Sequence, residues 1–194
     1  MHQQLIDYIN SRLSSPLTEQ EVALVKETFV PKRFRKHQFF LQQGDVCKVA
    51  GFIVKGAFKQ YTVDSTGKES VINLLIENWW VGDRESFTQE TPTPFFIDAL
   101  EECEVLLVNK HDFMEKLSEK RFIRQVIQMV TEKNAFQLLK RVQSTITLTA
   151  EQRFAELERN YPEFLQRFPQ HLIASYLGMT KETLSRIRSN ALKK

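Results

Sequence analysis

The stretch FPQHLIASYLGMTKETLSRIRSN, residues 168–190, carries the most informative pattern of the chain. Gly178 can adopt a positive φ and end a first helix in a tight turn, and Thr180 is a suitable N-cap for a second helix. A helix-turn-helix needs a small residue where its helices cross and an apolar residue that anchors the second helix, and Ala174 and Leu184 supply them. The stretch therefore predicts a helix-turn-helix.

The second helix of this stretch separates apolar from polar side chains. At about 100° per residue, Leu184 and Ile187 fall on one side, whereas Glu182 and Arg186 fall on the opposite side. Arginine can bind guanine edges and glutamate can accept a hydrogen bond from cytosine, while cations at the edge of such a helix are expected to contact phosphates. The predicted DNA-binding residues are Thr180, Lys181, Glu182, Ser185, Arg186, Arg188 and Ser189, with the terminal Lys193 and Lys194 as further phosphate contacts.

The positive charge of the chain is concentrated at its C-terminal end. The chain carries a net charge of +3, but residues 164–194 contain six Lys/Arg against one acid, Glu182, a local charge of +5. The other 163 residues carry 21 basic and 23 acidic groups, a charge of −2. A basic end on a nearly neutral body favours binding to a polyanion, and a solvated tail of lysines and arginines is the alternative.

Residues 34–108 have the composition of β-structure. The runs HQFFLQ, VAGFIVKGAFKQYTV, ESVINLLI and ECEVLLV are rich in β-branched and aromatic residues, and turn residues such as Gly44 separate them. Short strands joined by such turns predict an antiparallel sandwich or barrel. The residues before them predict two helices, the second of which begins at a capping box formed by Thr18 and Glu21.

Residues 118–146 contain neither Gly nor Pro and predict a helix of about 29 residues. Because its apolar residues fall on more than one stripe, we expect one face to meet a second protomer and predict Phe122, Val126 and Val130 as dimer contacts. The alternative is a helix packed wholly within its own chain. The predicted domains are residues 1–117 for the N-terminal helices and β-structure, 118–146 for the dimerisation helix and 147–194 for the helix-turn-helix domain.

In this order of parts the chain resembles the Crp/Fnr transcription regulators, which are related to the cyclic-AMP receptor protein. LIASYLGMTKETLSRI resembles their helix-turn-helix, and FFLQQGDVCKVAGFIVKGAFKQY resembles their early sensor strands, with Gly44 and Gly56 at the turns. The resemblance implies an α+β fold with an N-terminal antiparallel β-roll that senses an effector, like a cyclic-nucleotide-binding domain, then a long dimerisation helix and a C-terminal helix-turn-helix. It implies a homodimeric transcriptional regulator that binds a two-fold-symmetric operator in double-stranded DNA and has RNA polymerase as a partner. Lys181, Glu182 and Arg186 stand where the family usually contacts its operator.

The chain departs from this family in the effector pocket. Members that bind cyclic AMP carry a Gly-Glu pair for the ribose and an Arg-Ser pair for the cyclic phosphate. Gly82 and Asp83 resemble the first pair, but Thr93 and a proline stand at the second, which removes the charge-assisted contact to phosphate. We therefore expect no cyclic-AMP binding, leave an unknown small-molecule effector open, and regard Arg84 as a conceivable substitute at a different position. The predicted pocket residues are Trp80, Gly82, Asp83, Arg84, Thr93 and Phe95.

A second departure concerns the wings, the small β-hairpins with which the family brackets its helix-turn-helix. Neither PEFLQRFPQ before the motif nor the few residues after it leave room for a hairpin. This loss favours an alternative function, a ligand-binding β-roll protein that has lost specific DNA binding.

The remaining motifs point away from enzymes, metal centres and membranes. The four histidines form no HxH or HxxxH pair, Cys47 and Cys103 are too few for an iron–sulfur cluster, and no common catalytic motif occurs. No stretch reaches the roughly 20 apolar residues of a membrane helix, and the N-terminus does not have the pattern of a secretory signal. We expect a cytoplasmic protein that is not an enzyme, with no catalytic residue and no metal; residue counting leaves a bound haem open.

Overall fold

The computed structural model describes residues 1–191, so Lys193 and Lys194 lie outside the described residues. The chain forms two compact units, the first over residues 1–131 and the second beginning at Glu132. The boundary falls inside the long helix α5 (Arg121–Thr147), whereas the sequence predicted that this helix would be a domain of its own.

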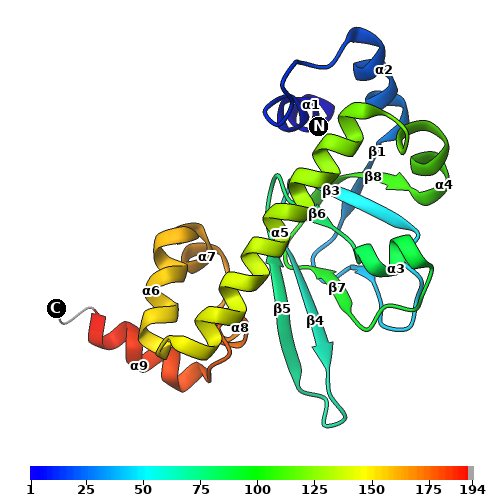
Figure 1. The fold of residues 1–194 in the computed structure, drawn as a ribbon. Helices are drawn as coiled ribbons and strands as arrows, with labels where there is room; N and C mark the ends of the chain where they lie inside the picture. Colours follow the sequence, from blue (N-terminus) through cyan, green and yellow to red (C-terminus); the bar gives the residue numbers. More distant parts are fainter. Residues whose placement is uncertain (192–194) are drawn as a thin grey trace. The chain divides into compact units, whose positions relative to one another are not determined.

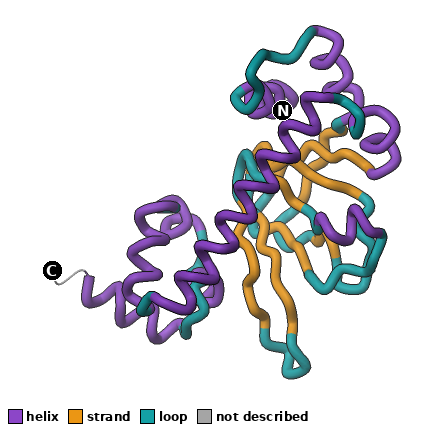
Figure 2. Tube along the Cα trace, viewed as in Figure 1, coloured by secondary structure: helices purple, strands orange, loops and turns teal. Residues whose placement is uncertain are grey.

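The first unit contains the expected antiparallel β-structure (Figures 1 and 2). Two four-stranded sheets have the strand orders β1-β8-β3-β6 and β2-β7-β4-β5, and every paired strand runs antiparallel to its neighbour. The strands are β1 (Val30–Phe34), β2 (Phe39–Leu41), β3 (Val49–Lys55), β4 (Phe58–Val63), β5 (Glu69–Leu75), β6 (Trp80–Val81), β7 (Phe96–Ala99) and β8 (Cys103–Asn109).

Side chains that alternate along these strands fill two separate cores. One core contains Phe58, Ile97 and Val105, which are fully buried among residues of both sheets. The close approach of the strands also explains Gly56, which joins β3 to β4 at φ 101°, because a side chain at this position would collide with Cys103. Gly44 likewise has a positive φ, of 90°.

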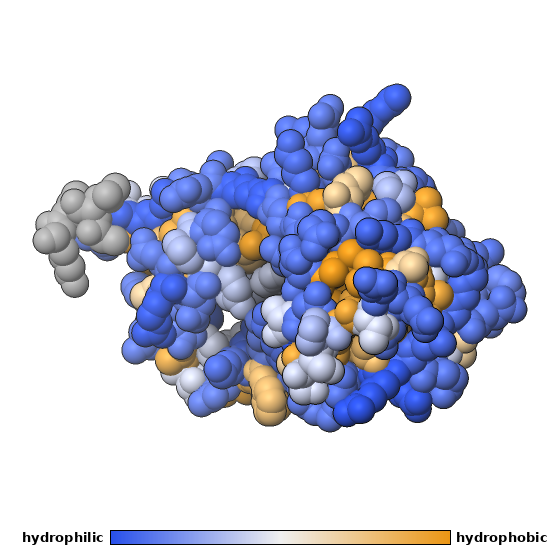
Figure 3. Space-filling view, turned by 90° about the horizontal axis from the view of Figure 1, so that it is seen from above, coloured by the Kyte–Doolittle hydropathy of each residue, from blue (hydrophilic) through white to orange (hydrophobic). Residues whose placement is uncertain are grey.

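A second core lies between β3, β6 and β8, the N-terminal helices and the first turns of α5. The helices α1 (His2–Asn10) and α2 (Glu19–Thr28) contribute Leu5, Ile9 and Val25, and α2 begins at the predicted capping box, in which Thr18 and Glu21 cap each other. Viewed from the side of these two helices, the surface is mostly hydrophilic, and hydrophobic side chains gather in patches between the polar ones (Figure 3).

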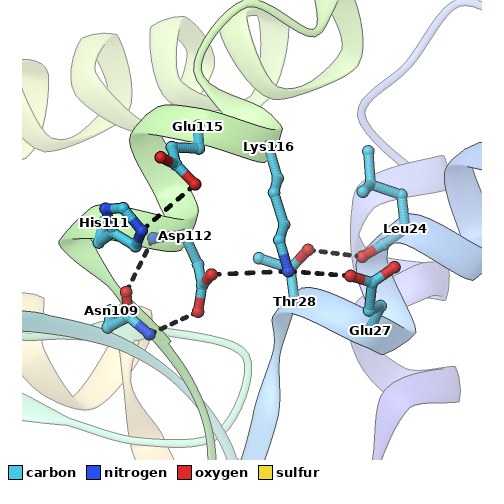
Figure 4. A network of polar contacts seen from close by, with 8 residues as sticks. All are labelled: Leu24, Glu27, Thr28, Asn109, His111, Asp112, Glu115 and Lys116. Carbon is cyan, nitrogen blue, oxygen red and sulfur yellow. Dashed lines mark hydrogen bonds and ion pairs between the residues drawn. The ribbon is translucent and has the colours of Figure 1, made fainter.

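A network of polar contacts connects α2 to the segment that precedes α5 (Figure 4). This segment consists of the short helix α4 (Lys110–Asp112) and a π-helical turn, η1 (Phe113–Leu117). Lys116 Nζ lies 2.8 Å from Glu27 Oε1 on α2 and 3.5 Å from Asp112 Oδ1, and Asn109 accepts a hydrogen bond from the Asp112 backbone N–H. Hydrogen bonds from Ser118 N to Phe113 O and from Lys120 N to Leu117 O then close the turn. For this reason α5 begins at Arg121, three residues after the predicted start.

The structure corrects the predicted dimer contacts on α5. Phe122 and Val126 are only 3% exposed and belong to the second core with α1 and α2, and Val130 is half-buried against the same core. A side chain that is buried within its own chain has no face left for a second protomer. The intramolecular alternative therefore holds for Phe122 and Val126, whereas Val130 keeps part of its surface exposed.

The described residues of the second unit form helices joined by short turns and contain no strand. After α5 come α6 (Ala150–Asn160), α7 (Pro162–Arg167), α8 (Gln170–Tyr176) and α9 (Lys181–Ala191). A capping box of Thr149 and Gln152 opens α6, and a core of buried apolar residues holds the helices together. The segment PEFLQR forms α7, so no hairpin precedes α8 in this part of the chain. The core residues are Phe154, Leu157, Phe164, Phe168, Leu172, Ile173, Leu184 and Ile187.

Candidate functional site

The helices α8 and α9 are joined by the tight turn that the sequence predicts at Gly178. This glycine has a φ of 66°, and its N–H donates to Ser175 O at 3.0 Å. The N–H of Met179 donates to Ala174 O, also at 3.0 Å, which completes a Schellman motif at the end of α8. Thr180 Oγ1 then accepts a hydrogen bond from Thr183 N at 3.2 Å and caps the start of α9.

One side of α9 is buried in the core of its unit, and the other side is exposed. Leu184 and Ile187 are buried, as their predicted role requires. Of the predicted DNA-binding residues, Arg188 is half-buried, and the others are exposed: Thr180, Lys181, Glu182, Ser185, Arg186 and Ser189. The structure thus brings all seven together on and beside one helix face.

Acidic groups at two helix starts accompany these cations. Its own backbone N–H and the Thr180 hydroxyl lower the pKa of Glu182. The pKa of Glu151, at the start of α6, is lowered by its own backbone N–H and the Thr149 hydroxyl, and also by the charge of Arg186. The charge of Arg186 therefore acts on the carboxylate of Glu151. The net charge of residues 132–194 is nevertheless positive, because they contain eleven Lys/Arg against six Asp/Glu.

Polar groups of the predicted effector pocket make hydrogen bonds within the chain. Asp83 caps the helix α3 (Arg84–Gln89), because its Oδ1 accepts from the N–H groups of Glu85 at 3.0 Å and Ser86 at 3.4 Å. Its other oxygen, Oδ2, accepts from Thr93 Oγ1 at 2.7 Å, and both side chains are buried. Both carboxylate oxygens of Asp83 are thus engaged by the protein itself.

The neighbouring polar groups are satisfied in the same way. Ser86 Oγ donates to Thr91 O at 2.5 Å and accepts from Cys47 N at 2.8 Å. The Phe95 N–H donates to Thr93 Oγ1 at 3.2 Å, and the intervening residue is a proline without an N–H. These donors and acceptors therefore form hydrogen bonds with one another within the chain.

Two predicted pocket residues lie elsewhere. Val81 contributes to the core between the sheets, so Trp80, the residue before it, points to the opposite face of the same strand. The Trp80 ring lies 5.4 Å from that of Phe52, and its Nε1 donates to the Tyr8 hydroxyl of α1 at 3.2 Å. Arg84 is exposed and donates a hydrogen bond to Thr131 Oγ1 on α5. Trp80 is therefore part of the core beneath the N-terminal helices, contrary to its predicted place in the pocket.

Residues 31–120 match the family that is described as the cyclic nucleotide-binding domain. This part of the chain is therefore similar to a cyclic nucleotide-binding domain. The matched residues contain the eight strands from β1 to β8 apart from the first residue of β1, together with α3, α4 and η1. Among curated proteins, none matches the chain.

Solved structures of Crp/Fnr regulators share the fold over most of the chain. A CooA mutant from Carboxydothermus hydrogenoformans has a TM-score of 0.72 at 17% identity and covers 97% of this chain and 84% of its own. FixK2 from Bradyrhizobium japonicum has a TM-score of 0.71 at 17% identity, with 85% of each chain covered. The c-di-GMP responsive global regulator CLP from Xanthomonas campestris has a TM-score of 0.66 at 12% identity, over 91% of this chain and 92% of its own. The resemblance to the Crp/Fnr regulators is confirmed at the level of the fold.

Neither of the two cysteine thiols, Cys47 and Cys103, is suited to act as a nucleophile or a metal ligand. Burial raises the pKa of Cys47, and burial also raises the pKa of Cys103 to about 11, so both remain protonated at neutral pH. Within the described residues, no group of His, Cys, Asp and Glu side chains could hold a metal ion. The same residues contain no helix that is long and apolar enough to cross a membrane.

The structure reveals an exposed apolar face on α5 that the sequence analysis did not single out. Phe136 is 63% exposed and Ile146 is 77% exposed, although both are large apolar side chains. Met129 and Phe136 are seven residues apart, as are Leu139 and Ile146, and this heptad spacing was the available signal. The exposed apolar residues of α5 are Met129, Phe136, Leu138, Leu139, Val142 and Ile146.

Proposed function

We propose that this protein is a DNA-binding transcriptional regulator and that α9 is the recognition helix of a helix-turn-helix. The observation that carries this proposal is the exposed polar face of α9, which lies over the buried Leu184 and Ile187 and follows a Schellman turn. The Crp/Fnr fold supports it, because the structural neighbours are DNA-binding regulators. A regulator of this kind acts in the cytoplasm and is not an enzyme, and RNA polymerase is a partner by family likeness.

The residues of α9 have different proposed roles in this complex. Arg186 lies on the exposed face, where a guanidinium can bind a guanine edge through two hydrogen bonds. Lys181 at the start of the helix and the half-buried Arg188 hold the phosphate backbone. Glu182 and the exposed hydroxyls of Thr180, Ser185 and Ser189 complete the contact surface.

We propose that the regulator is a homodimer and binds a two-fold-symmetric operator. The Crp/Fnr neighbours act as DNA-binding dimers. In this chain, the heptad-spaced and exposed Met129, Phe136, Leu139 and Ile146 are suited to a helix–helix contact with a second copy. They take the place of the predicted contacts Phe122, Val126 and Val130. The first two are buried in the core of the chain, and Val130 is half-buried against it.

We propose that cyclic AMP is not the effector. The internal bond between Asp83 and Thr93 occupies the groups that would otherwise meet the ligand, and no arginine stands at the phosphate position. Arg84 donates a hydrogen bond from the same region to Thr131 on α5, a contact that needs no bridging ligand. Calorimetry with cyclic AMP and cyclic GMP should give no binding at micromolar concentrations. Micromolar or tighter affinity for either nucleotide would overturn this part of the proposal.

The alternative, a β-roll protein that has lost specific DNA binding, draws on the absence of wing hairpins among the described residues. Selection of duplexes from a random pool, followed by gel shifts at increasing salt, separates the two functions. A regulator should enrich a two-fold-symmetric sequence, and its affinity should fall steeply with salt because phosphate contacts release counterions. Absence of any enriched sequence would favour the alternative.

The assignment of Arg186 is tested on the selected duplex. Because a bidentate arginine contact is worth about 1–3 kcal/mol, Arg186→Ala should weaken specific binding by up to about a hundredfold and spare random DNA more. Lys181→Ala should weaken both alike and lower the salt slope by about one unit. Arg159→Ala, which removes an exposed arginine of α6, is the matched control for the loss of charge. Equal losses on operator and random DNA for Arg186→Ala would contradict the assignment.

A further inference from the structure

The carbonyl groups at the end of α8 accept hydrogen bonds from backbone amides and from arginine side chains. The last four carbonyl groups of a helix have no partner within the helix itself. Here Ala174 O and Ser175 O accept from the amides of the Schellman turn. The other two carbonyls, those of Tyr176 and Leu177, accept hydrogen bonds from two arginine side chains.

The first arginine comes from α5. Arg141 Nη2 donates to Tyr176 O at 3.1 Å, and the guanidinium lies over the Tyr176 ring, 4.4 Å from its centroid. The same row of α5 makes two more polar contacts with the unit, from Gln137 to the Tyr161 hydroxyl at 2.8 Å and from Ser144 to Glu156 at 3.1 Å. Arg141 thus belongs to a polar face of α5 that points to α6, α7 and α8.

The second arginine comes from α6 and bridges two helix ends. Arg153 Nε donates to Leu177 O at 3.1 Å, while its Nη1 donates to Leu148 O, just beyond the end of α5, at 2.9 Å. A cation at the carbonyl end of a helix also interacts favourably with the helix dipole. The planar guanidinium can make both bonds at once, which a lysine ammonium on its single nitrogen cannot do with the same geometry.

We propose that Arg141 and Arg153 are positioning residues for the recognition helix. Together they hold both carbonyls that immediately precede Gly178, so α5 and α6 set the geometry of the turn and the direction in which α9 leaves it. The inference rests on the proposed DNA-binding function and specifies what aligns its contact surface. Because hydrogen bonds tolerate only a few tenths of an ångström, a displacement of α5 by 1.5 Å, the rise of one residue, is enough to release Tyr176 O.

The test compares Arg141→Ala and Arg153→Ala with Arg159→Ala, which removes the same charge from an exposed site. We expect each of the first two changes to weaken binding to the selected duplex by about tenfold and binding to a random duplex by no more than about twofold. Arg159→Ala should leave both affinities within about twofold. Arg141→Lys and Arg153→Lys should recover only part of the loss, since they restore a charge but not the planar geometry.

Hydrogen exchange supplies a second measurement that does not depend on DNA. The amides of Gly178 and Met179, which close the turn, should exchange at least about fivefold faster in both alanine variants, while amides in the middle of α6 keep the wild-type rate. If an alanine variant does not fold, its lysine counterpart takes its place in both measurements.

The outcomes distinguish this proposal from the proposed function. Unchanged exchange at the turn, or equal losses on selected and random DNA, would overturn the positioning role. If the wild-type protein enriches no DNA sequence, the proposed function fails, and the exchange rates alone then decide whether the arginines hold the turn.

Discussion

The two halves of α5 use their side chains in opposite ways. The first half, up to Thr131, buries the apolar Phe122 and Val126 against α1 and α2. The second half faces its own unit with the polar Gln137, Arg141 and Ser144 and leaves its large apolar side chains exposed. A single uninterrupted helix therefore follows the usual apolar-inward pattern over one half and reverses it over the other.

This difference explains why helical periodicity alone selected Phe122 and Val126, which the chain itself buries, as dimer contacts. Periodicity identifies apolar stripes, but the neighbouring elements determine which stripe is covered within the chain. The N-terminal helices cover the first half of α5, and their docking is a long-range event that no local pattern of α5 records. An apolar residue that remains exposed after folding is the better candidate for an interface.

The largest effect that tests this comparison is expected in the first half of α5. Val126→Lys places an unpaired charge in the core and should lower the free energy of unfolding by about 3–5 kcal/mol. Val142→Lys, at a position that is 48% exposed in the second half, should change it by no more than about 0.5 kcal/mol. Urea denaturation followed by circular dichroism measures both. Similar losses for the two variants would remove the contrast.

The next largest effect concerns association. Phe136→Lys should leave the fold intact and raise the dimer dissociation constant by at least about a hundredfold, since one apolar side chain per protomer, each worth about 1.5–3 kcal/mol, is lost from the interface. Light scattering over a concentration series measures the change, with Asn134→Lys as a control that adds the same charge at another exposed position of this half. A wild-type protein that is monomeric at micromolar concentration would refute the dimer.

A smaller effect tests the polar face of the second half. Tyr161→Phe removes the hydroxyl that accepts from Gln137 and should lower the free energy of unfolding by about 0.5–1.5 kcal/mol. The ring contact of Tyr161 with Phe164, with centroids 5.0 Å apart, is retained in this variant and separates the hydrogen bond from the packing. No change in urea denaturation would show that this polar contact contributes nothing.

The smallest effect is a dependence on alkaline pH. Burial raises the pKa of Tyr176 above its ordinary value of 10.0, although the charge of Arg141 opposes the shift. Because the folded state then keeps its proton longer than the unfolded state, this contribution to stability is complete below pH 10 and is lost as the pH rises toward the folded pKa. Wild-type protein should therefore lose more stability than Tyr176→Phe between pH 8 and 10.5, by less than about 1 kcal/mol. Parallel urea curves for the two proteins over this range would exclude the contribution.

Local signals predicted much of the fold. The capping box at Thr18 and the turn at Gly178 depend on residues that are close in sequence, and both are present in the structure. The antiparallel strands followed from runs rich in β-branched and aromatic residues that turn residues separate. The π-helical turn η1 was not predicted, because its start and end depend on contacts with α2 as well as on its own residues.

In the candidate sites, too, sequence patterns predicted local features but not contacts between distant elements. The residues of α9 could be placed on one face from helical geometry alone. Trp80 could not be assigned, because aromatic composition does not say which face of a two-residue strand meets the N-terminal helices. Likewise, the family resemblance placed Thr93 where other members have an arginine, but only the structure shows that Thr93 donates a hydrogen bond to Asp83.

The hydrogen bond between Thr93 and Asp83 has a consequence for how such a protein would respond to metabolites in the cell. Both groups belong to one chain, so their encounter is unimolecular and does not depend on the concentration of any metabolite. A contact of this kind has no dose–response curve and no saturation. For the proposed regulator, a contact that replaces the ligand would leave the occupancy of DNA sites to be set by how many copies of the chain are made and how fast they are degraded.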